Sequence, residues 1–164
     1  MERPLPEIAH RLPASSAVRF VGDLHLGDRG RNDAFRDKDA LFIDFLKESQ
    51  NACEAIVFMG DTFDVPQAWS LKAITRAHPE VMQAMEALSH RVQMYFVRGN
   101  HDWTLDYQRL FPQSHTCEAL AVGDALVWHG HRLDHFCHPD RPFHRWTIAL
   151  HHAVERTLGF EFRV

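Results

Sequence analysis

Four short stretches of this chain combine residue types that bind metal ions, and each follows an apolar run. In each stretch, carboxylate, imidazole or amide-oxygen donors stand beside a glycine. The four stretches are Gly22-Asp23-Leu24-His25, Gly60-Asp61-Thr62-Phe63-Asp64, Gly99-Asn100-His101-Asp102 and His129-Gly130-His131. This donor set lacks thiolate, so it suits Mn²⁺, Fe or Zn²⁺ in a reactive site better than a structural zinc site. A carboxylate that bridges two ions about 3.5–4 Å apart would allow such a site to activate water and clamp a phosphoryl group.

Strands are predicted to carry these stretches at their C-terminal ends. Apolar runs rich in β-forming residues occupy 17–22, 55–59 and 93–97, and two more runs, 117–122 and 125–128, flank a hairpin turn. If the backbone stays extended after the first run, Asp23 and His25 point to the same side and can bind one ion together.

Helices are predicted between these strands. One begins at Asn32 or Asp33 and has an apolar face that includes Leu41, Phe42, Phe45 and Leu46; another covers 70–90 and breaks at Pro79. A last amphipathic helix is predicted over 143–158. The alternation indicates an α/β fold, in which ligands bind at the C-terminal ends of strands.

Length and composition indicate one soluble globular domain. The chain has 164 residues, of which 45% are hydrophobic and 24% charged. Residues 1–16, which contain three prolines, are predicted to be an irregular lead-in, and residues 17–164 the domain. Three cysteines without a CxxC pair favour a reducing, cytoplasmic setting, and no segment is long and apolar enough to cross a membrane.

The charge and histidine content narrow the function. A net charge of −4 argues against a dedicated nucleic-acid binder, and therefore against a nuclease, but it does not exclude a phosphorylated substrate. Thirteen histidines exceed what a core or a solvated surface requires, which favours a metal site.

The order D-x-H, G-D-x-x-D, G-N-H-D and a histidine after a further strand resembles the calcineurin-like metallophosphoesterases over 18–131. The resemblance implies a layered β-sandwich flanked by helices, with two divalent ions, Mn²⁺ first and Fe or Zn²⁺ as alternatives. It assigns Asp23 and His25 to the first metal, Asp61 to both, and Asn100 and His129 to the second.

The same resemblance implies a hydrolase of phosphoric ester or pyrophosphate bonds that uses a metal-bound hydroxide. His101 would stabilise the transition state or protonate the leaving oxygen without binding metal, and Asp102 would orient it. Asp64 is expected to be a turn residue beside the metal ligands, whereas His78 and His90 are expected to be exposed and His10 to be solvated.

The family's closing G-H-x-H motif is absent. The chain is therefore expected to be C-terminally incomplete; alternatively, His131 substitutes as a ligand. A second hypothesis is a non-catalytic or weakly metal-binding remnant of the fold that serves as a scaffold or interaction domain.

Two motifs resemble the branch that contains UDP-2,3-diacylglucosamine pyrophosphatases: Gly60 to Asp64 followed by Trp69, and the stretch 129–134. This branch implies a phosphorylated small-molecule or lipid-linked substrate. The helix over 143–158 is compatible with peripheral membrane contact, although an ordinary helix that covers the sheet is the simpler expectation.

Overall fold

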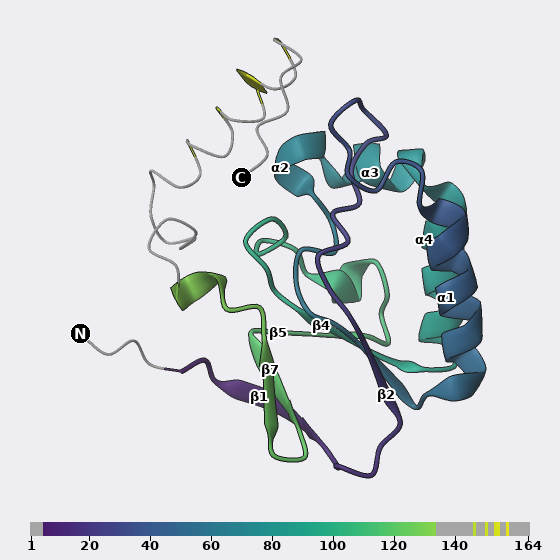
Figure 1. Cartoon of the computed structure of the whole chain (residues 1–164), viewed down its shortest axis with the longest axis vertical. Helices are drawn as coiled ribbons and strands as arrows, with labels where there is room; N and C mark the ends of the chain where they lie inside the picture. The colour runs from purple at the N-terminus through teal and green to yellow at the C-terminus, as the bar shows by residue number, and fades with distance from the viewer. Residues whose placement is uncertain (1–4, 134–145, 147–149, 151–152, 155–156, 158–164) are drawn as a thin grey trace.

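The computed structural model describes residues 5–133 together with positions 146, 150, 153, 154 and 157 (Figure 1). One sheet has four parallel strands in the order β2-β3-β4-β5. These strands are β2 (Val18–Val21), β3 (Ala55–Phe58), β4 (Gln93–Val97) and β5 (His115–Cys117). Because they are parallel, their C-terminal ends lie at one edge of the sheet, as the sequence predicted.

A second sheet has three strands in the order β1-β6-β7. Strand β6 (Ala119–Val122) pairs antiparallel with β7 (Ala125–Trp128), which confirms the predicted hairpin. The predicted run 117–122 is not one strand, because β5 ends at Cys117 in the first sheet and β6 begins at Ala119 in the second. Only Glu118 separates these two strands.

The expectation that residues 1–16 are irregular is wrong. They contain β1 (Ile8–Leu12), which pairs parallel with β6. Half-buried and exposed residues alternate along β1, as they do in a strand with one covered face. His10 is half-buried rather than solvated, and its ring centroid lies 5.3 Å from that of Tyr95 and 4.6 Å from that of His115.

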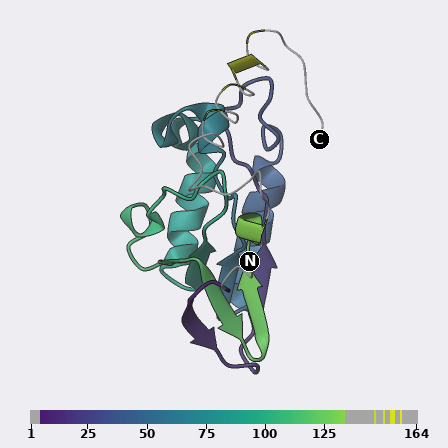
Figure 2. The same ribbon diagram turned by 90° about the vertical axis from the view of Figure 1, so that its left-hand side faces the viewer.

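Helices cover the face of the four-stranded sheet that points away from the three-stranded sheet (Figures 1 and 2). In the described part these are α1 (Asp39–Ala52), the short α2 (Val65–Ala68), α3 (Leu71–Ala77) and α4 (Pro79–Ser89). The predicted break at Pro79 is confirmed, because α3 ends before it and α4 begins with it.

Alternate residues of the central strands fill two cores. Ile56 and Phe58 of β3 pack in the cluster beneath the helices, whereas Ala55 and Val57 pack in the cluster between the sheets. All four are buried, as expected for a parallel strand covered on both faces. The predicted α/β layers are confirmed.

Helix α1 begins later than predicted. Asp33 does not cap it; its side chain accepts hydrogen bonds from the N–H groups of Phe35 (2.8 Å) and Arg29 (2.7 Å) and so stabilises the preceding loop. The helix begins at Asp39, and Leu41 is exposed instead of lying on the apolar face.

The amphipathic helix predicted over 143–158 lies outside the described residues except at five positions. Of these, Trp146, Leu150 and Thr157 are exposed. Within the described part, no helix has both the length and the apolar character that crossing a bilayer requires.

Candidate metal centre

The backbone segments that follow β2 and β3 run side by side and bring two of the predicted motifs together. Asp23 N–H donates to Gly60 O (3.2 Å), and His25 N–H donates to Asp61 O (2.9 Å). These bonds extend the parallel pairing of β2 and β3 beyond the strands themselves. The carboxylate and imidazole groups of the two motifs are therefore neighbours.

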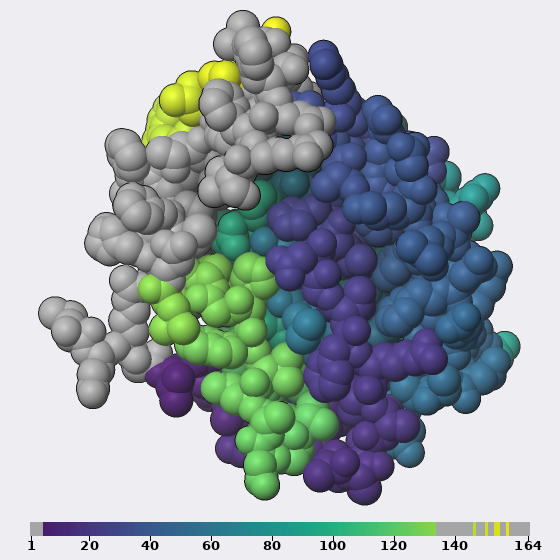
Figure 3. Space-filling view, in the orientation of Figure 1, coloured from purple at the N-terminus to yellow at the C-terminus, as the bar shows by residue number. Residues whose placement is uncertain are grey.

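Four of the five predicted metal ligands are gathered within direct reach of one another. Single donor atoms of Asp23, His25 and Asp61 all lie within 4.8 Å of each other, and His25 Nε2 is 3.7 Å from Asp61 Oδ2. The β6–β7 hairpin adds His129, whose Nε2 lies 3.5 Å from both Asp23 Oδ1 and Asp61 Oδ2. On the face drawn in Figure 3, the green surface of the hairpin borders the purple surface around β2.

The backbone at three of these residues is left-handed: φ is 51° at Asp23, 50° at His25 and 49° at Asp61. The extended conformation expected for Asp23 and His25 is thus wrong, although the two side chains do meet. Left-handed backbone is sterically costly for residues with a Cβ, and such residues gather where function fixes the geometry. Here the paired segments hold the conformation in place.

The third motif closes against Asp61. The N–H of His101 donates to Asp61 Oδ1 (2.8 Å). A Cβ on Gly99 would lie only 2.0 Å from the same oxygen, so only glycine permits this approach. Asn100, the fifth predicted ligand, stands between these two residues and is half-buried.

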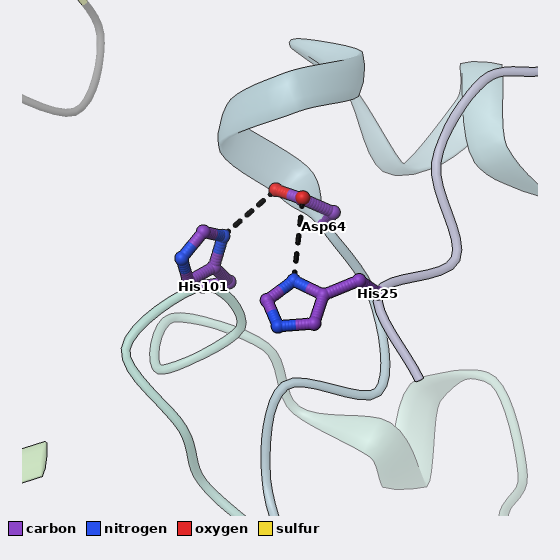
Figure 4. A group of neighbouring side chains, drawn as sticks. All are labelled: His25, Asp64 and His101. Carbon is purple, nitrogen blue, oxygen red and sulfur yellow. Dashed lines mark hydrogen bonds and ion pairs between the residues drawn. The ribbon is translucent and has the colours of Figure 1, made fainter. Parts of the chain in front are cut away.

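A carboxylate that the sequence left as a turn residue holds His101. His101 Nδ1–H donates to Asp64 Oδ1 (2.8 Å), and His25 Nδ1 lies 3.3 Å from Asp64 Oδ2 (Figure 4). Donor atoms of His25, Asp64 and His101 also lie within 4.8 Å of one another. Asp64 additionally accepts the N–H of Gln67 at the start of α2.

The hydrogen bond and opposite charges of His101 and Asp64 determine how this pair is protonated. Burial alone would lower the pKa of His101, but the hydrogen bond and charge of Asp64 outweigh it, so that the pKa of His101 is raised. Burial alone would raise the pKa of Asp64, but hydrogen bonds from His101 and His25 hold it well below its usual range. The structure therefore favours an imidazolium beside a carboxylate.

The hydrogen bonds of Asp102 join two loops, and its predicted role in orienting His101 stays a prediction. Its carboxylate is fully buried and accepts hydrogen bonds from Thr62 N–H (2.7 Å), Gly99 N–H (2.7 Å) and Tyr107 O–H (2.5 Å). Burial is the main reason that its pKa is raised. Because Thr62 follows β3 and Gly99 follows β4, Asp102 fixes the spacing between the second and third motifs.

Three further histidines were given predicted positions or roles. His131 is buried, and its Nδ1 lies 3.1 Å from Nδ1 of His129; its service as a substitute ligand stays a prediction. His78, expected to be exposed, is fully buried, with Nδ1 2.7 Å from Asp39 and Nε2 3.4 Å from Asp33. The exposure predicted for His90 is confirmed.

The donor set fits a hard or borderline divalent cation. It provides carboxylate oxygens and imidazole nitrogens, with His129 Nε2 equally distant from two carboxylates. Gly60 completes the fit: a Cβ there would lie 2.4 Å from His129 Cδ2, so only glycine lets the hairpin approach this closely.

Comparisons with known proteins show which family this chain is similar to. The family model described as calcineurin-like phosphoesterase matches residues 17–162. The UDP-2,3-diacylglucosamine hydrolase of Shewanella sp. (strain MR-7) is 29% identical over 147 residues, which cover 85% of this chain and 56% of the relative. The protein of the same name from Shewanella pealeana is 29% identical over 138 residues, which cover 77% of this chain and 52% of the relative. The chain thus spans about half the length of the curated relatives it matches.

Among solved structures, the nuclease MPE of Pseudomonas putida aligns with a TM-score of 0.41 and 19% identity, over 63% of this chain and 48% of the nuclease. The family match covers most of the sequence and includes every motif described above. The chain belongs to the calcineurin-like phosphoesterase family.

Proposed function

We propose that this chain forms the metal-binding part of a hydrolase that cleaves phosphoric ester or pyrophosphate bonds. The observation that carries the proposal is the meeting of Asp23, His25, Asp61 and His129 from three separate strand ends. Membership of the family supports divalent metal ions as cofactors.

Two ions are proposed, with Mn²⁺ as the first choice and Fe or Zn²⁺ as alternatives. Asp23 and His25 would hold one ion, Asn100 and His129 the other, and Asp61 both. When bound, such ions supply a nucleophile at neutral pH by lowering the pKa of water, and they neutralise phosphoryl charge.

His101 is proposed to act on the leaving group. With its Nδ1–H directed to Asp64, a protonated ring carries its second proton on Nε2, from which it can protonate a departing oxygen. The adjacent carboxylate of Asp64 favours this protonated state.

The substrate class is proposed from the relatives. Both are named for UDP-2,3-diacylglucosamine, so we infer a pyrophosphate-containing or lipid-linked substrate for this chain. Peripheral membrane contact and a reducing, cytoplasmic setting belong to the same proposal. Exposed Trp146 and Leu150 support the first, and the free thiols of Cys53 and Cys117 support the second.

Hydrolysis of p-nitrophenyl phosphate with and without Mn²⁺ tests the proposal. Asp61→Ala should reduce the Mn²⁺-dependent rate by more than about 100-fold, because it removes the carboxylate shared by both ions. Asp44→Ala is the matched control, since Asp44 is an exposed carboxylate on α1. Equal rates for the two variants would overturn the catalytic proposal and leave the scaffold hypothesis.

A further inference from the structure

Three polar rings meet where β1, an edge strand of one sheet, lies against β5, an edge strand of the other. The ring centroid of His10 lies 4.6 Å from that of His115 and 5.3 Å from that of Tyr95. Tyr95 stacks on His115 at a centroid distance of 5.0 Å. The rings come from β1, β5 and β4, so this cluster joins the two sheets. The candidate metal centre uses none of the three.

The two imidazoles of the cluster have nitrogens available to a ligand. His10 and His115 are half-buried, so solvent reaches part of each residue. Within the described residues, their ring nitrogens take part in no hydrogen bond or ion pair. The ring nitrogens of His25, His78 and His101, by contrast, each contact a carboxylate. Burial, and to a lesser extent the charge of His10, lower the pKa of His115, which favours the neutral ring that binds metal.

The spacing of the two imidazoles suits one metal ion. Two imidazoles that bind an ion at about 2.0–2.1 Å, with an angle of about 90–110° between them, have ring centroids about 4.5–5 Å apart. The observed 4.6 Å lies within this range, so the backbone already spaces the two rings for one ion. Tyr95 contacts both rings and limits their movement, which reduces the entropy that is lost when an ion binds.

We propose that His10 and His115 together bind one divalent transition-metal ion of the Zn²⁺ type, at a site separate from the candidate metal centre. Imidazole nitrogen suits Zn²⁺, Ni²⁺ and Cu²⁺, and water completes the coordination because both residues are partly exposed. The ion bridges β1 and β5 and so links the edges of the two sheets. His129 of the candidate metal centre follows β7, at the opposite edge of the three-stranded sheet from β1.

The first test is calorimetric titration of Zn²⁺ into the full chain without a histidine tag. Every variant also carries Asp61→Ala, which weakens the candidate metal centre equally in all of them. His10→Gln and His115→Gln should each weaken one Zn²⁺-binding event by about 100-fold or more, because two linked ligands bind far more tightly than one. The variant with both substitutions should bind no more weakly than either single variant. His90→Gln, which removes an exposed histidine, is the control.

The second test is thermal unfolding in the same Asp61→Ala background, with and without Zn²⁺. Because the proposed ion bridges two sheets only in the folded state, Zn²⁺ should raise the unfolding midpoint of His90→Gln more than that of His10→Gln. His10→Phe and His115→Phe retain the ring contacts with Tyr95 and remove only the nitrogens. They should therefore fold without Zn²⁺ and lose the same binding event as the glutamine variants.

The inference is overturned if His10→Gln and His10→Phe bind Zn²⁺ as tightly as His90→Gln. It is also overturned if the losses of the two single substitutions add in the double variant, because that result would indicate two independent single-histidine sites. Neither test measures hydrolysis, so the result does not depend on the proposed function.

Discussion

His101 Nδ1 lies 2.8 Å from Asp64 Oδ1, so a carboxylate that follows β3 holds a histidine that follows β4. The same carboxylate contacts His25, which follows β2. The side chain of Asp64 therefore joins three strand ends, and its N–H also donates to Leu26 O (2.8 Å) in the segment after β2. Asp64, rather than the sequence neighbour Asp102, makes the hydrogen bond to the His101 ring.

His101→Ala should slow the hydrolysis of alkyl phosphates more than that of aryl phosphates. A protonating histidine contributes roughly 10²- to 10⁴-fold when the leaving oxygen needs a proton. p-Nitrophenolate leaves without one, so its release should be much less affected. The measurement is the Mn²⁺-dependent rate with glycerol 3-phosphate and with p-nitrophenyl phosphate.

His90→Ala is the control for this comparison, because His90 is an exposed histidine at the end of α4. Asp64→Asn should change the two rates in the same direction as His101→Ala, but less, since an amide retains one acceptor oxygen. Equal losses with both substrates would show that His101 does not act on the leaving group.

Tyr107→Phe should destabilise the fold by about 1–3 kcal/mol, because the buried carboxylate of Asp102 loses a hydrogen-bond donor. The ring itself is retained, and with it the stacking on Phe96 at a centroid distance of 3.9 Å. Urea unfolding in EDTA measures the change. A cycle with Asp102→Asn should show coupling between the two positions, and strictly additive losses would contradict the contact.

Folding stability should fall as the pH rises above about 6.5 and through the raised pKa of His78. Burial alone would lower the pKa of His78, but Asp33 and Asp39 outweigh it and raise the pKa above the unfolded value. The stabilisation is therefore complete below the unfolded pKa of about 6.5 and is lost as the pH rises through the folded pKa.

Urea midpoints measured across this pH range test the role of His78. His78→Gln should flatten the decline, whereas His90→Gln, at an exposed position, should leave the decline unchanged. If wild type and His78→Gln lose stability in parallel, the buried ion pairs are not responsible.

Trp69→Gly should be more stable than Trp69→Ala by about 1 kcal/mol. Trp69 ends α2 with a φ of 63°, and 60% of its surface is exposed. Both substitutions remove the same ring, so the difference in stability between them measures the cost of the left-handed backbone conformation. Glycine adopts this conformation without steric cost. Unfolding midpoints that coincide for the two variants would rule out strain at this position.

The sequence predicted elements well where an apolar run met a strong terminator. Strand β4 has the predicted boundaries because Gly99 follows it, and the hairpin was marked by Gly123-Asp124. Strand β1 was missed because its flanking prolines suggested irregular chain, whereas its pairing with β6 depends on residues more than a hundred positions later.

Partners of polar side chains were harder to predict than the motifs themselves. Asp102 neighbours His101 in sequence, yet Asp64 contacts it, because parallel pairing of β3 with β4 sets their loops side by side. His78 seemed isolated, since Asp33 and Asp39 lie about 40 residues earlier and join it only through tertiary packing. Local patterns report which residue types follow a strand, but the sheet order determines which of them meet.

His129 and Asp23 are in contact although about 100 residues of chain separate them. The two residues are therefore synthesised at different times. Such distant contacts form only after the intervening loops have closed, which makes folding slow. A cation that needs both residues gains little from the unfolded polypeptide and should bind after the last hairpin docks. Metal binding at this centre would then report the final step of folding. By mass action, the bound metal would also stabilise the folded state.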